Sequence, residues 1–358
     1  MKMPIHQVVV GAAMGDAITS MALNIREALS EYGNSKIFAV FPDSSVLDKV
    51  HPIQELANED DSRTLIYHSS YGVRELTARL VCWRGDLILQ YHNVTPDYFF
   101  EEIDPEFAEG LRWGKKELEL LRPKVVRAIA DSSFNASDLL SCGYRDVDVL
   151  PSGVDSHKLS QIAPDIRIAN YYRHLFPNGY AIAVSQLLPH KRMELAVAAV
   201  HQVRELWGID LGLVIVGVER SGTYSGAVRS YAERLLGNNF RMTGRLNDRQ
   251  LSTLFRHALV YLGMSEHEGL SIPLIDSMAL GVPAVVRGFG AIPETAGDGA
   301  VVVNPTGGAS EIAKTIVDVT SDSAIRKALI GRGFEQAKKF EKHAILKRFT
   351  TALSEELK

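Results

Sequence analysis

The chain has 358 residues, of which 46% are hydrophobic and 23% are charged, so it is a globular protein of a length that suits two domains. Its formal net charge of −4 offers no basic field to a nucleic acid, and nucleic acid is excluded as an expected partner. The two cysteines, Cys82 and Cys142, make neither a CxxC pair nor a disulfide framework. This cysteine pattern suggests a reducing, cytoplasmic location. No apolar run reaches the roughly 18 residues that a membrane span needs, so no membrane span is expected.

Short apolar runs alternate with helix-length segments along the first half of the chain. The run "HQVVVG" (6–11) ends in glycine, and "DAITSMALNIREALSEYG" (16–33) has helical spacing and stops at Gly33. Runs that are apolar on both faces and alternate with helices predict a parallel sheet covered on both sides. Further strands are expected at 36–41, 64–68, 86–92, 126–131 and 146–150, and a helix at 72–83.

A loop-rich stretch (150–179) with three prolines interrupts the pattern, which then starts again. Strands are expected at 180–185, 211–217, 240–244, 259–263, 283–286 and 300–304, and a helix at 191–207. The pattern predicts an α/β protein with a doubly wound Rossmann-like domain at 1–165 and a second one at 175–340. The last helix, within 341–358, is expected to return to the first domain. Because such sheets bind ligands at the carboxyl ends of their strands, we expect the two domains to face each other across a cleft.

The stretch "SEHEGLSIPLIDSMALGVPAVV" (265–286) carries two carboxylates eight positions apart, Glu268 and Asp276. Ser271 is predicted to cap a helix whose first turn holds Pro273 and which ends at Gly281. The backbone N–H groups before that helix form a site for an anion or a hydroxyl group, with Glu268 in the loop and Asp276 about one turn inside the helix.

This stretch resembles a signature of the retaining GT-B glycosyltransferases of glycosyltransferase family 4 (group 1). In that family the first acid meets the hydroxyls of the donor sugar and the second meets the ribose, roles that the resemblance assigns to Glu268 and Asp276. The segment "SQLLPHKRMELAV" (185–197) is similar to a second family segment, in which an arginine and a lysine neutralise the leaving diphosphate. Lys191 and Arg192 match that segment, whereas Gln186 stands where an arginine is expected. A lysine and an arginine at the start of a helix are also misplaced electrostatically unless an anion lies there.

A third segment, "YHNVTPDYFF" (91–100), is similar to one in members that assemble polysaccharides, which makes His92 the first catalytic candidate and His68 the second. The loop "GAAMGD" (11–16) suits close approach of the backbone to a diphosphate or an acceptor. The resemblance implies catalytic roles for His92, His68, Glu268, Lys191 and Arg192. It implies a donor site made of Gly15, Asp16, Gln186, Lys191, Arg192, Gly244, Arg245, Leu246, Glu268, Gly269, Leu270, Ser271 and Asp276.

The function that this resemblance implies is the retaining transfer of a hexose from a nucleotide-diphosphate sugar, GDP-mannose or a UDP-sugar. The acceptor would be a glycan or a lipid-linked glycan in cell-surface polysaccharide or glycolipid assembly. No cofactor and no metal are expected, because GT-B enzymes generally need none and the acids of "DVDV" (146–149) fall in a strand. The sequence does not indicate an oligomeric state.

Three alternatives stay open. A GT-B nucleotide-sugar epimerase would use the same cleft without an acceptor. A pseudoenzyme that only binds nucleotide-sugar would agree with the departures at Gln186 and Asp276. The basic segment "GLRWGKKELELLRPKVVR" (110–127) is typical of a solvated helix face, or else of a peripheral contact with the inner face of a membrane.

Overall fold

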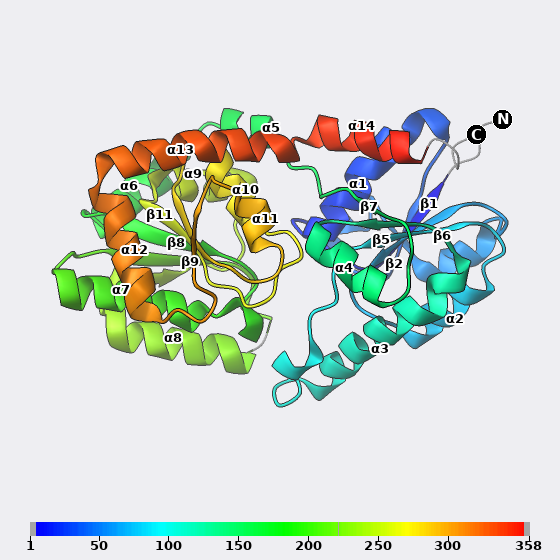
Figure 1. The fold of residues 1–358 in the computed structure, drawn as a ribbon, viewed down its shortest axis with the longest axis horizontal. Coiled ribbons are helices and arrows are strands. Elements are labelled where there is room, and N and C mark those ends of the chain that lie inside the picture. Colours follow the sequence, from blue (N-terminus) through cyan, green and yellow to red (C-terminus); the bar gives the residue numbers. More distant parts are fainter. Residues whose placement is uncertain (1–4, 221, 354–358) are drawn as a thin grey trace. The chain divides into compact units, whose positions relative to one another are not determined.

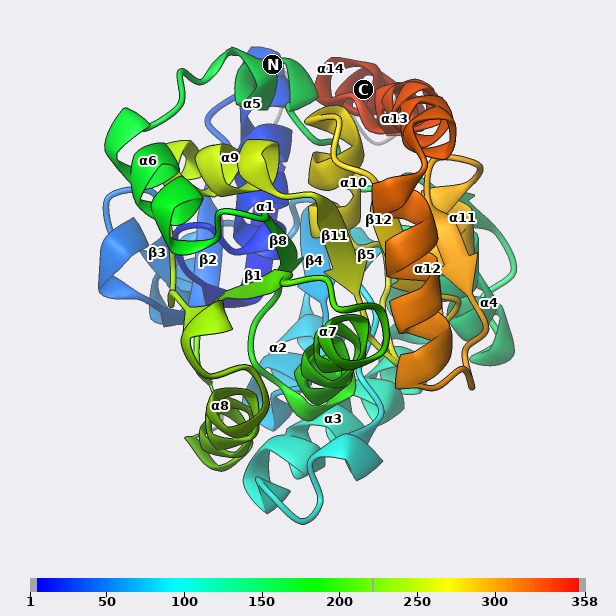
Figure 2. The same ribbon diagram turned by 90° about the vertical axis from the view of Figure 1, so that its left-hand side faces the viewer.

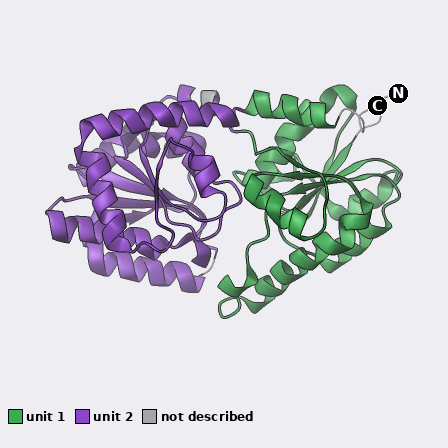
Figure 3. Ribbon diagram, in the orientation of Figure 1, with its two compact units in different colours: residues 1–153, 342–358 green, residues 154–341 purple. Residues whose placement is uncertain are grey.

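The computed structural model describes residues 5–220 and 222–353. Its contacts divide the chain into unit 1, residues Met1–Gly153 with Lys342–Lys358, and unit 2, residues Val154–Glu341 (Figure 3). The sequence placed the end of the first domain at residue 165, whereas the structure assigns 154–165 to unit 2. The reason is that helix α5 (Ser156–Gln161) packs on α9 (Asp248–His257) and α10 (Ile272–Ala279).

Unit 1 contains a parallel sheet of seven strands in the order β3-β2-β1-β4-β5-β6-β7 among the residues that the structure describes. The strands are β1 (His6–Ala12), β2 (Ile37–Pro42), β3 (His51–Pro52), β4 (Leu65–Ser69), β5 (Leu87–Tyr91), β6 (Val125–Ala130) and β7 (Val147–Val149). The helices are α1 (Ala17–Ala28), α2 (Arg74–Cys82), α3 (Pro105–Leu121), α4 (Ser133–Ser141) and α14 (Lys342–Ala352), shown in Figure 1. Short 3₁₀ turns lie at Ser30–Tyr32, Ser44–Val46, Ile53–Asn58, Asp97–Phe99 and Arg122–Lys124.

The core of unit 1 includes the last helix of the chain. Ile66, Ile88 and Ile129, from β4, β5 and β6, form one buried cluster with Ile25 of α1 and Phe349 of α14. Helix α14 also contacts α1 directly. The part of the expected helix beyond residue 353 lies outside the described residues.

Unit 2 contains a second parallel sheet, of six strands in the order β10-β9-β8-β11-β12-β13 in the described part of the chain. The strands are β8 (Tyr180–Val184), β9 (Gly212–Val216), β10 (Phe240–Met242), β11 (Val260–Gly263), β12 (Ala284–Arg287) and β13 (Val301–Val303). Besides α5, α9 and α10, the helices are α6 (Ile166–Leu175), α7 (Met193–Trp207), α8 (Gly222–Leu236), α11 (Ile292–Ala296), α12 (Ala309–Ser321) and α13 (Ser323–Ala337). The 3₁₀ turns are Pro189–Lys191, Gly237–Asn239 and Lys338–Phe340.

Alternation along the central strands of unit 2 buries both faces of the sheet. In β8, Ala181 and Ala183 join the cluster under α7, α8 and α12. Tyr180 and Ile182 join the opposite cluster, to which α6, α9 and α10 contribute (Figure 2). Successive side chains of a strand point to opposite faces, so a strand apolar throughout must be covered on both sides. The doubly wound parallel sheets expected from the sequence are confirmed.

The stretch 150–179 is more regular than its three prolines suggest. It contains α5 and α6, and both begin at an aspartate: Asp155 accepts a hydrogen bond from the Lys158 backbone N–H, and Asp165 accepts from Arg167 and Ile168. Aspartate is a strong N-cap residue, a signal that the proline content obscured. Within 5–220 and 222–353, no helix combines the length and the apolar character needed to cross a bilayer.

Candidate functional site

Two of the sequence segments meet in unit 2 through an ion pair. Lys191 ends the turn after β8, and Glu268 lies in the loop after β11, the strand beside β8 in the sheet. Lys191 Nζ donates to Glu268 Oε1 at 2.7 Å, and Ser265 Oγ donates to the same oxygen at 2.7 Å. The side chains of Lys191 and Glu268 keep 15% and 16% of their surface exposed, so both remain accessible to a ligand.

The backbone of Glu268 is held by its neighbour Gly290. The Ala291 N–H donates to the Glu268 carbonyl at 2.9 Å. Gly290 has φ +58, and a Cβ there would come within 2.5 Å of the same carbonyl oxygen. Only glycine allows both the left-handed conformation and this close approach, so the loop that presents Glu268 is fixed by packing.

Arg192 has carboxylate partners of its own. Its Nε lies 2.5 Å from Glu194 Oε1, and its Nη1 lies 2.9 Å from Glu266 Oε1. The buried Arg287 contacts the same Glu266 oxygen at 3.2 Å. The argument that cations at this helix start require a bound anion is therefore wrong, because the chain itself supplies the anions. Glu266 and Arg287 lie far from Arg192 in the sequence, and only the sheet brings them together.

The start of α10 differs in part from the expectation. Ser271 lies in the left-handed region, with φ +76 and ψ +73, and its side chain makes no capping hydrogen bond. The cap prediction is wrong because a capping side chain reaches the first-turn N–H groups from extended backbone. Pro273 in the first turn and Gly281 just after the helix, at φ +71, are confirmed. Thr295 Oγ1 donates to the Leu270 carbonyl at 2.5 Å and ties down the loop that follows Gly269.

Asp276 lies about one turn into α10 and is half-buried. Burial, with a smaller contribution from the negative Asp248, raises the pKa of Asp276 to about 7. In the described part of the chain no donor hydrogen-bonds its carboxyl group, so the group is available to a hydroxyl-bearing ligand.

Three loops lie together where β8, β9 and β10 end. The backbone bonds from Ser185 N to Val216 O and from Gly217 N to Gly244 O, at 3.0 and 3.1 Å, tie these loops to one another. The loop after β9 thus lies between the loop that carries Gln186 and the loop that carries Gly244, Arg245 and Leu246, and a shared donor site for these residues stays a prediction.

The sequence analysis missed Arg220. Its Nη1 lies 3.5 Å from Gln186 Oε1, and it makes no ion pair with a carboxylate of the described chain. Arg245 is exposed and likewise has no carboxylate partner there. The available signal was the position of Arg220 in the loop that follows β9, the strand beside β8, four residues after that strand ends.

In unit 1, Asp16 serves as a helix cap. Its Oδ2 accepts from the backbone N–H and the hydroxyl of Thr19, both at 2.9 Å. Gly15 precedes it at φ +75, and a Cβ at that position would meet no atom within 4 Å. Both residues lie just after β1, so the structure puts them at the carboxyl end of the sheet.

His68 and His92 lie side by side, also at this end of the sheet. His68 Nδ1 and His92 Nε2 are 2.9 Å apart, and the two rings are almost coplanar, at 3°. Each second ring nitrogen is also engaged: His68 Nε2 with Gln7 Oε1 at 2.9 Å, and His92 Nδ1 with Asp131 Oδ2 at 2.7 Å. The sequence analysis found the histidines and missed Gln7 and Asp131, which come from other strands.

Most cations of the basic segment 110–127 are neutralised. Arg112 pairs with Asp97 and Glu109, at 3.0 and 3.2 Å. Lys115 pairs with Asp138 at 2.9 Å. Paired cations have less charge to offer an anionic lipid surface, which favours the solvated-face alternative for this segment.

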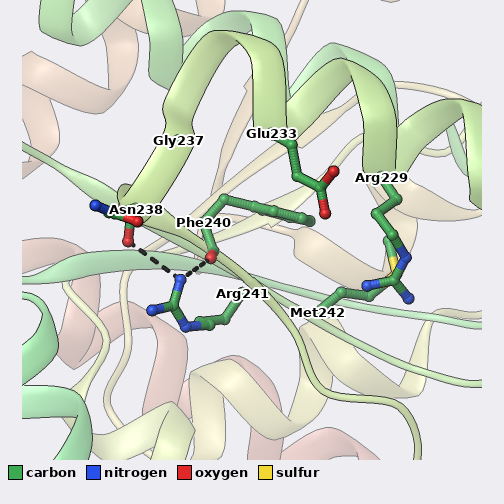
Figure 4. A pocket seen from close by; sticks show the side chains of 7 residues that line it. All are labelled: Arg229, Glu233, Gly237, Asn238, Phe240, Arg241 and Met242. Carbon is green, nitrogen blue, oxygen red and sulfur yellow. Dashed lines mark hydrogen bonds between the residues drawn. The ribbon is translucent and has the colours of Figure 1, made fainter.

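A shallow surface pocket lies beside the edge strand β10 (Figure 4). Arg241 Nη1 donates there to the backbone carbonyls of Asn238 and Phe240, at 3.2 and 2.6 Å. None of the expected site residues lines this pocket.

In the described part of the chain, no three His, Cys, Asp or Glu side chains gather in a way that would hold a metal ion. The metal-independent reaction stays a prediction.

The comparisons with known proteins agree with these features. Residues 177–336, which lie in unit 2, match the family model of the glycosyl transferases group 1. The two Rossmann-like units have the GT-B fold. The solved structure of HepE from Anabaena, in complex with UDP and glucose, superposes with a TM-score of 0.79 over 99% of this chain and 100% of that one, at 16% identity.

Curated relatives are similar over part of their length. The O-antigen chain mannosyltransferase B of Escherichia coli is 26% identical over 163 residues, 45% of this chain and 42% of that protein. A GDP-mannose-dependent monoacylated alpha-(1-6)-phosphatidylinositol monomannoside mannosyltransferase of Corynebacterium glutamicum is 26% identical over 191 residues, 51% of this chain and 49% of that protein. The chain thus spans about half the length of the curated relatives that it matches.

Proposed function

We propose that the chain is a glycosyltransferase that moves a hexose from a nucleotide-diphosphate sugar to a glycan or lipid-linked acceptor, with retention and without a metal. The observation that carries this proposal is the contact between Lys191 and Glu268. It joins a cation and a carboxylate at the carboxyl end of a doubly wound sheet, where such sheets bind nucleotides.

In the proposed reaction the bond from the anomeric carbon to the diphosphate breaks as positive charge develops on the sugar. The acceptor oxygen bonds to the anomeric carbon on the same face, and the departing phosphate takes the proton of the acceptor hydroxyl. The Lys191 ammonium stabilises the negative charge on the departing phosphate, which is often the largest contribution to catalysis. Glu268 accepts hydrogen bonds from the sugar hydroxyls, and the half-buried Asp276 accepts them from the ribose. Lys191 and Glu268 orient each other before the donor arrives, so little rearrangement is needed during the reaction.

GDP-mannose is the first donor to test. Two curated relatives are named as mannosyltransferases, and one of them is named as GDP-mannose-dependent. A UDP-sugar is the second, because HepE binds UDP and glucose and has the same fold. The relatives' names refer to an O-antigen chain and to a phosphatidylinositol mannoside, which supports a glycan or lipid-linked acceptor.

A nucleotide-sugar-binding protein without transferase activity is the second candidate. It is favoured by the uncharged Gln186 and by Arg192, whose charge Glu194 and Glu266 neutralise.

Nucleotide-sugars added singly to the protein separate these candidates. A bound donor stabilises the fold by mass action, so we expect GDP-mannose or one UDP-sugar to raise the melting temperature. Mass spectrometry of the same donor, incubated with lipid and oligosaccharide extracts of the source cells, should then show a glycosylated product and free nucleoside diphosphate. NMR of the product should show the anomeric configuration of the donor. A raised melting temperature with an unaltered donor would favour the binding protein, and an isomerised free nucleotide-sugar would favour an epimerase.

A further inference from the structure

Five side chains of unit 1 form one hydrogen-bonded row, here called the polar row: Gln7, His68, His92, Asp131 and Gln90. It runs from Gln7, the second residue of β1, to the carboxyl ends of β4, β5 and β6, and these four strands are consecutive in the sheet. Gln7 Nε2 begins it by donating to the Ala22 carbonyl of α1 at 3.0 Å. Gln90 Nε2 ends it by donating to Asp131 Oδ1 at 2.9 Å.

The polar row is buried. Gln7, His68 and Gln90 have no exposed surface. The side chains of His92 and Asp131 keep only 4% and 6% of theirs. Bulk water therefore offers these groups few alternative partners, and the atoms that link one member of the row to the next bond mainly to one another. Gln90 Oε1 is buried without a hydrogen-bond partner in the described part of the chain.

The direction of the hydrogen bonds along the polar row follows from the two ends of the row. Because the Gln7 amide nitrogen donates to a carbonyl, Gln7 Oε1 is the acceptor that faces His68, and His68 Nε2 must carry the proton. Burial, and then the neighbouring His92, lower the pKa of His68 well below its usual 6.5, so this ring is neutral. Its Nδ1 is then an acceptor, and His92 Nε2 must donate to it.

The other nitrogen of His92 faces a carboxylate. Asp131 Oδ2 lies 2.7 Å from His92 Nδ1, and Asp131 Oδ1 already accepts from Gln90. An ionised carboxylate only accepts, so with Asp131 in that form His92 would donate from both ring nitrogens. The nearby carboxylate of Asp138 has its own cation, Lys115, and adds no second counter-ion to the row.

We infer that Asp131 and His68 hold the His92 ring as a doubly protonated cation, fixed at the carboxyl end of the unit 1 sheet. In the glycosyl transfer proposed above, on which this role rests, His92 contributes positive charge and takes no proton from the acceptor. Asp131 and His68 are positioning residues, because they act through the His92 ring.

The protonation of His92 is measured directly by NMR of protein labelled with ¹⁵N-histidine. At pH 7 we expect two N–H correlations from the His92 ring and one, at Nε2, from His68. Loss of these signals in His92→Gln and His68→Gln assigns them. A His92 ring with a proton on one nitrogen only would place the second proton on Asp131 and would overturn the inference.

Asp131→Asn removes the counter-ion while keeping the size of the side chain. We expect this variant to lose one of the two His92 correlations. Asp138→Asn is the matched control, since it changes a neighbouring carboxylate that does not contact either histidine, and it should keep both. If Asp131→Asn fails to fold, the wild-type spectrum alone still decides the protonation state.

The pH dependence of transfer tests the role. The rate is measured at saturating donor, so that the pH dependence of donor binding does not enter. A histidine that acts as a general base would then make the rate fall below its ordinary pKa near 6.5, whereas the doubly protonated ring predicts no such fall from His92. A rate that falls in step with a titrating His92 signal would refute the role. Two N–H correlations without any transfer activity would leave the polar row standing and count against the proposed function instead.

Discussion

At the scale of single residues, the cations near the carboxyl ends of the unit 2 strands fall into two groups. Lys191 and Arg192 each bind carboxylates of the chain. Arg220 and Arg245 have no carboxylate partner in the part that the structure describes. A diphosphate entering this region would meet net positive charge from the second group, which includes the residue beside Gln186.

Replacing Arg220 by glutamine should weaken the binding of a nucleoside diphosphate. Loss of one charge-assisted hydrogen bond costs about 1 kcal/mol, or roughly fivefold in affinity, measured by calorimetry with GDP and UDP. Gln186→Arg in the same variant should restore the affinity, because it returns a charge 3.5 Å from the one removed.

The matched control for Arg220 is Arg229→Gln. Arg229 is a nearby exposed arginine that is already bound to Glu219, and its loss should leave the affinity unchanged. Wild-type affinity in Arg220→Gln would show that this arginine contributes nothing to the site.

Asp276 should make nucleotide binding depend on pH. The ionised carboxylate accepts stronger hydrogen bonds from ribose hydroxyls than the acid does, and the pKa of about 7 means that it gains a proton between pH 8 and pH 6. Wild-type affinity should therefore fall over this interval by more than that of Asp276→Asn. The phosphate of the nucleotide titrates equally in both experiments. An equal fall in the affinity of the two proteins would therefore show that Asp276 does not bind the ribose.

The same residue should affect stability, with a sign set by the raised pKa. The folded state keeps a proton on Asp276 that the unfolded state releases near pH 4, so this residue lowers the free energy of unfolding as pH rises from about 4 to 7. The melting temperature of Asp276→Asn, measured relative to that of wild type at each pH, should therefore rise between about pH 4 and pH 7.

At the scale of elements, the end of β9 sets the spacing between the loops that follow β8 and β9, part of the proposed nucleotide site. Gly217 has φ +155, and a Cβ there would lie 1.6 Å from the Ser185 carbonyl oxygen. Gly217→Ala must push the β8 and β9 loops apart, and we expect it to lose most nucleoside diphosphate binding and to lower the melting temperature. Gly226→Ala, in α8 with open space around it, should bind normally and be slightly more stable because alanine favours helix. Normal binding by Gly217→Ala would show that the loops tolerate the displacement.

Local patterns predicted the elements well and the contacts between them poorly. Apolar runs that end in glycine or a polar residue located β1 and β8 because burial on both faces leaves a signal in the sequence itself. The distant partners of Arg192 and His92 left no signal in the sequence, because these contacts depend on which strands become neighbours in the sheet. Glu266 reaches Arg192 from 74 positions away, and Asp131 reaches His92 from 39. The left-handed Ser271 was missed because serine before a proline-containing turn usually signals a cap.

At the scale of the whole molecule, unit 1 is built from both ends of the chain. Phe349 of α14 is 1% exposed and lies in the same cluster as Ile25 of α1. Phe349→Ala should therefore destabilise unit 1 by about 3–5 kcal/mol in urea unfolding, the usual cost of emptying a buried phenylalanine site. Trp83 and Trp113 lie in unit 1 and Trp207 in unit 2. In a Trp207→Phe background, tryptophan fluorescence therefore follows the unfolding of unit 1 alone. Lys347→Ala, an exposed change on the same helix, should cost little, and equal stability of the two variants would mean that α14 adds nothing to unit 1.

One measurement tests the central claim most directly: the rate at which wild type and Lys191→Ala release nucleoside diphosphate. The substrate is the nucleotide-sugar that raises the melting temperature, and the acceptor extract is present. In the proposed reaction Lys191 stabilises the leaving group mainly in the transition state, so its loss should slow release by about 10²–10³ while the protein stays folded. Lys314→Ala removes an exposed lysine that pairs with Asp318 of its own helix, and it should release nucleoside diphosphate at the wild-type rate. Wild-type release by a folded Lys191→Ala would contradict the account, because the contact between Lys191 and Glu268 would then have no part in the reaction.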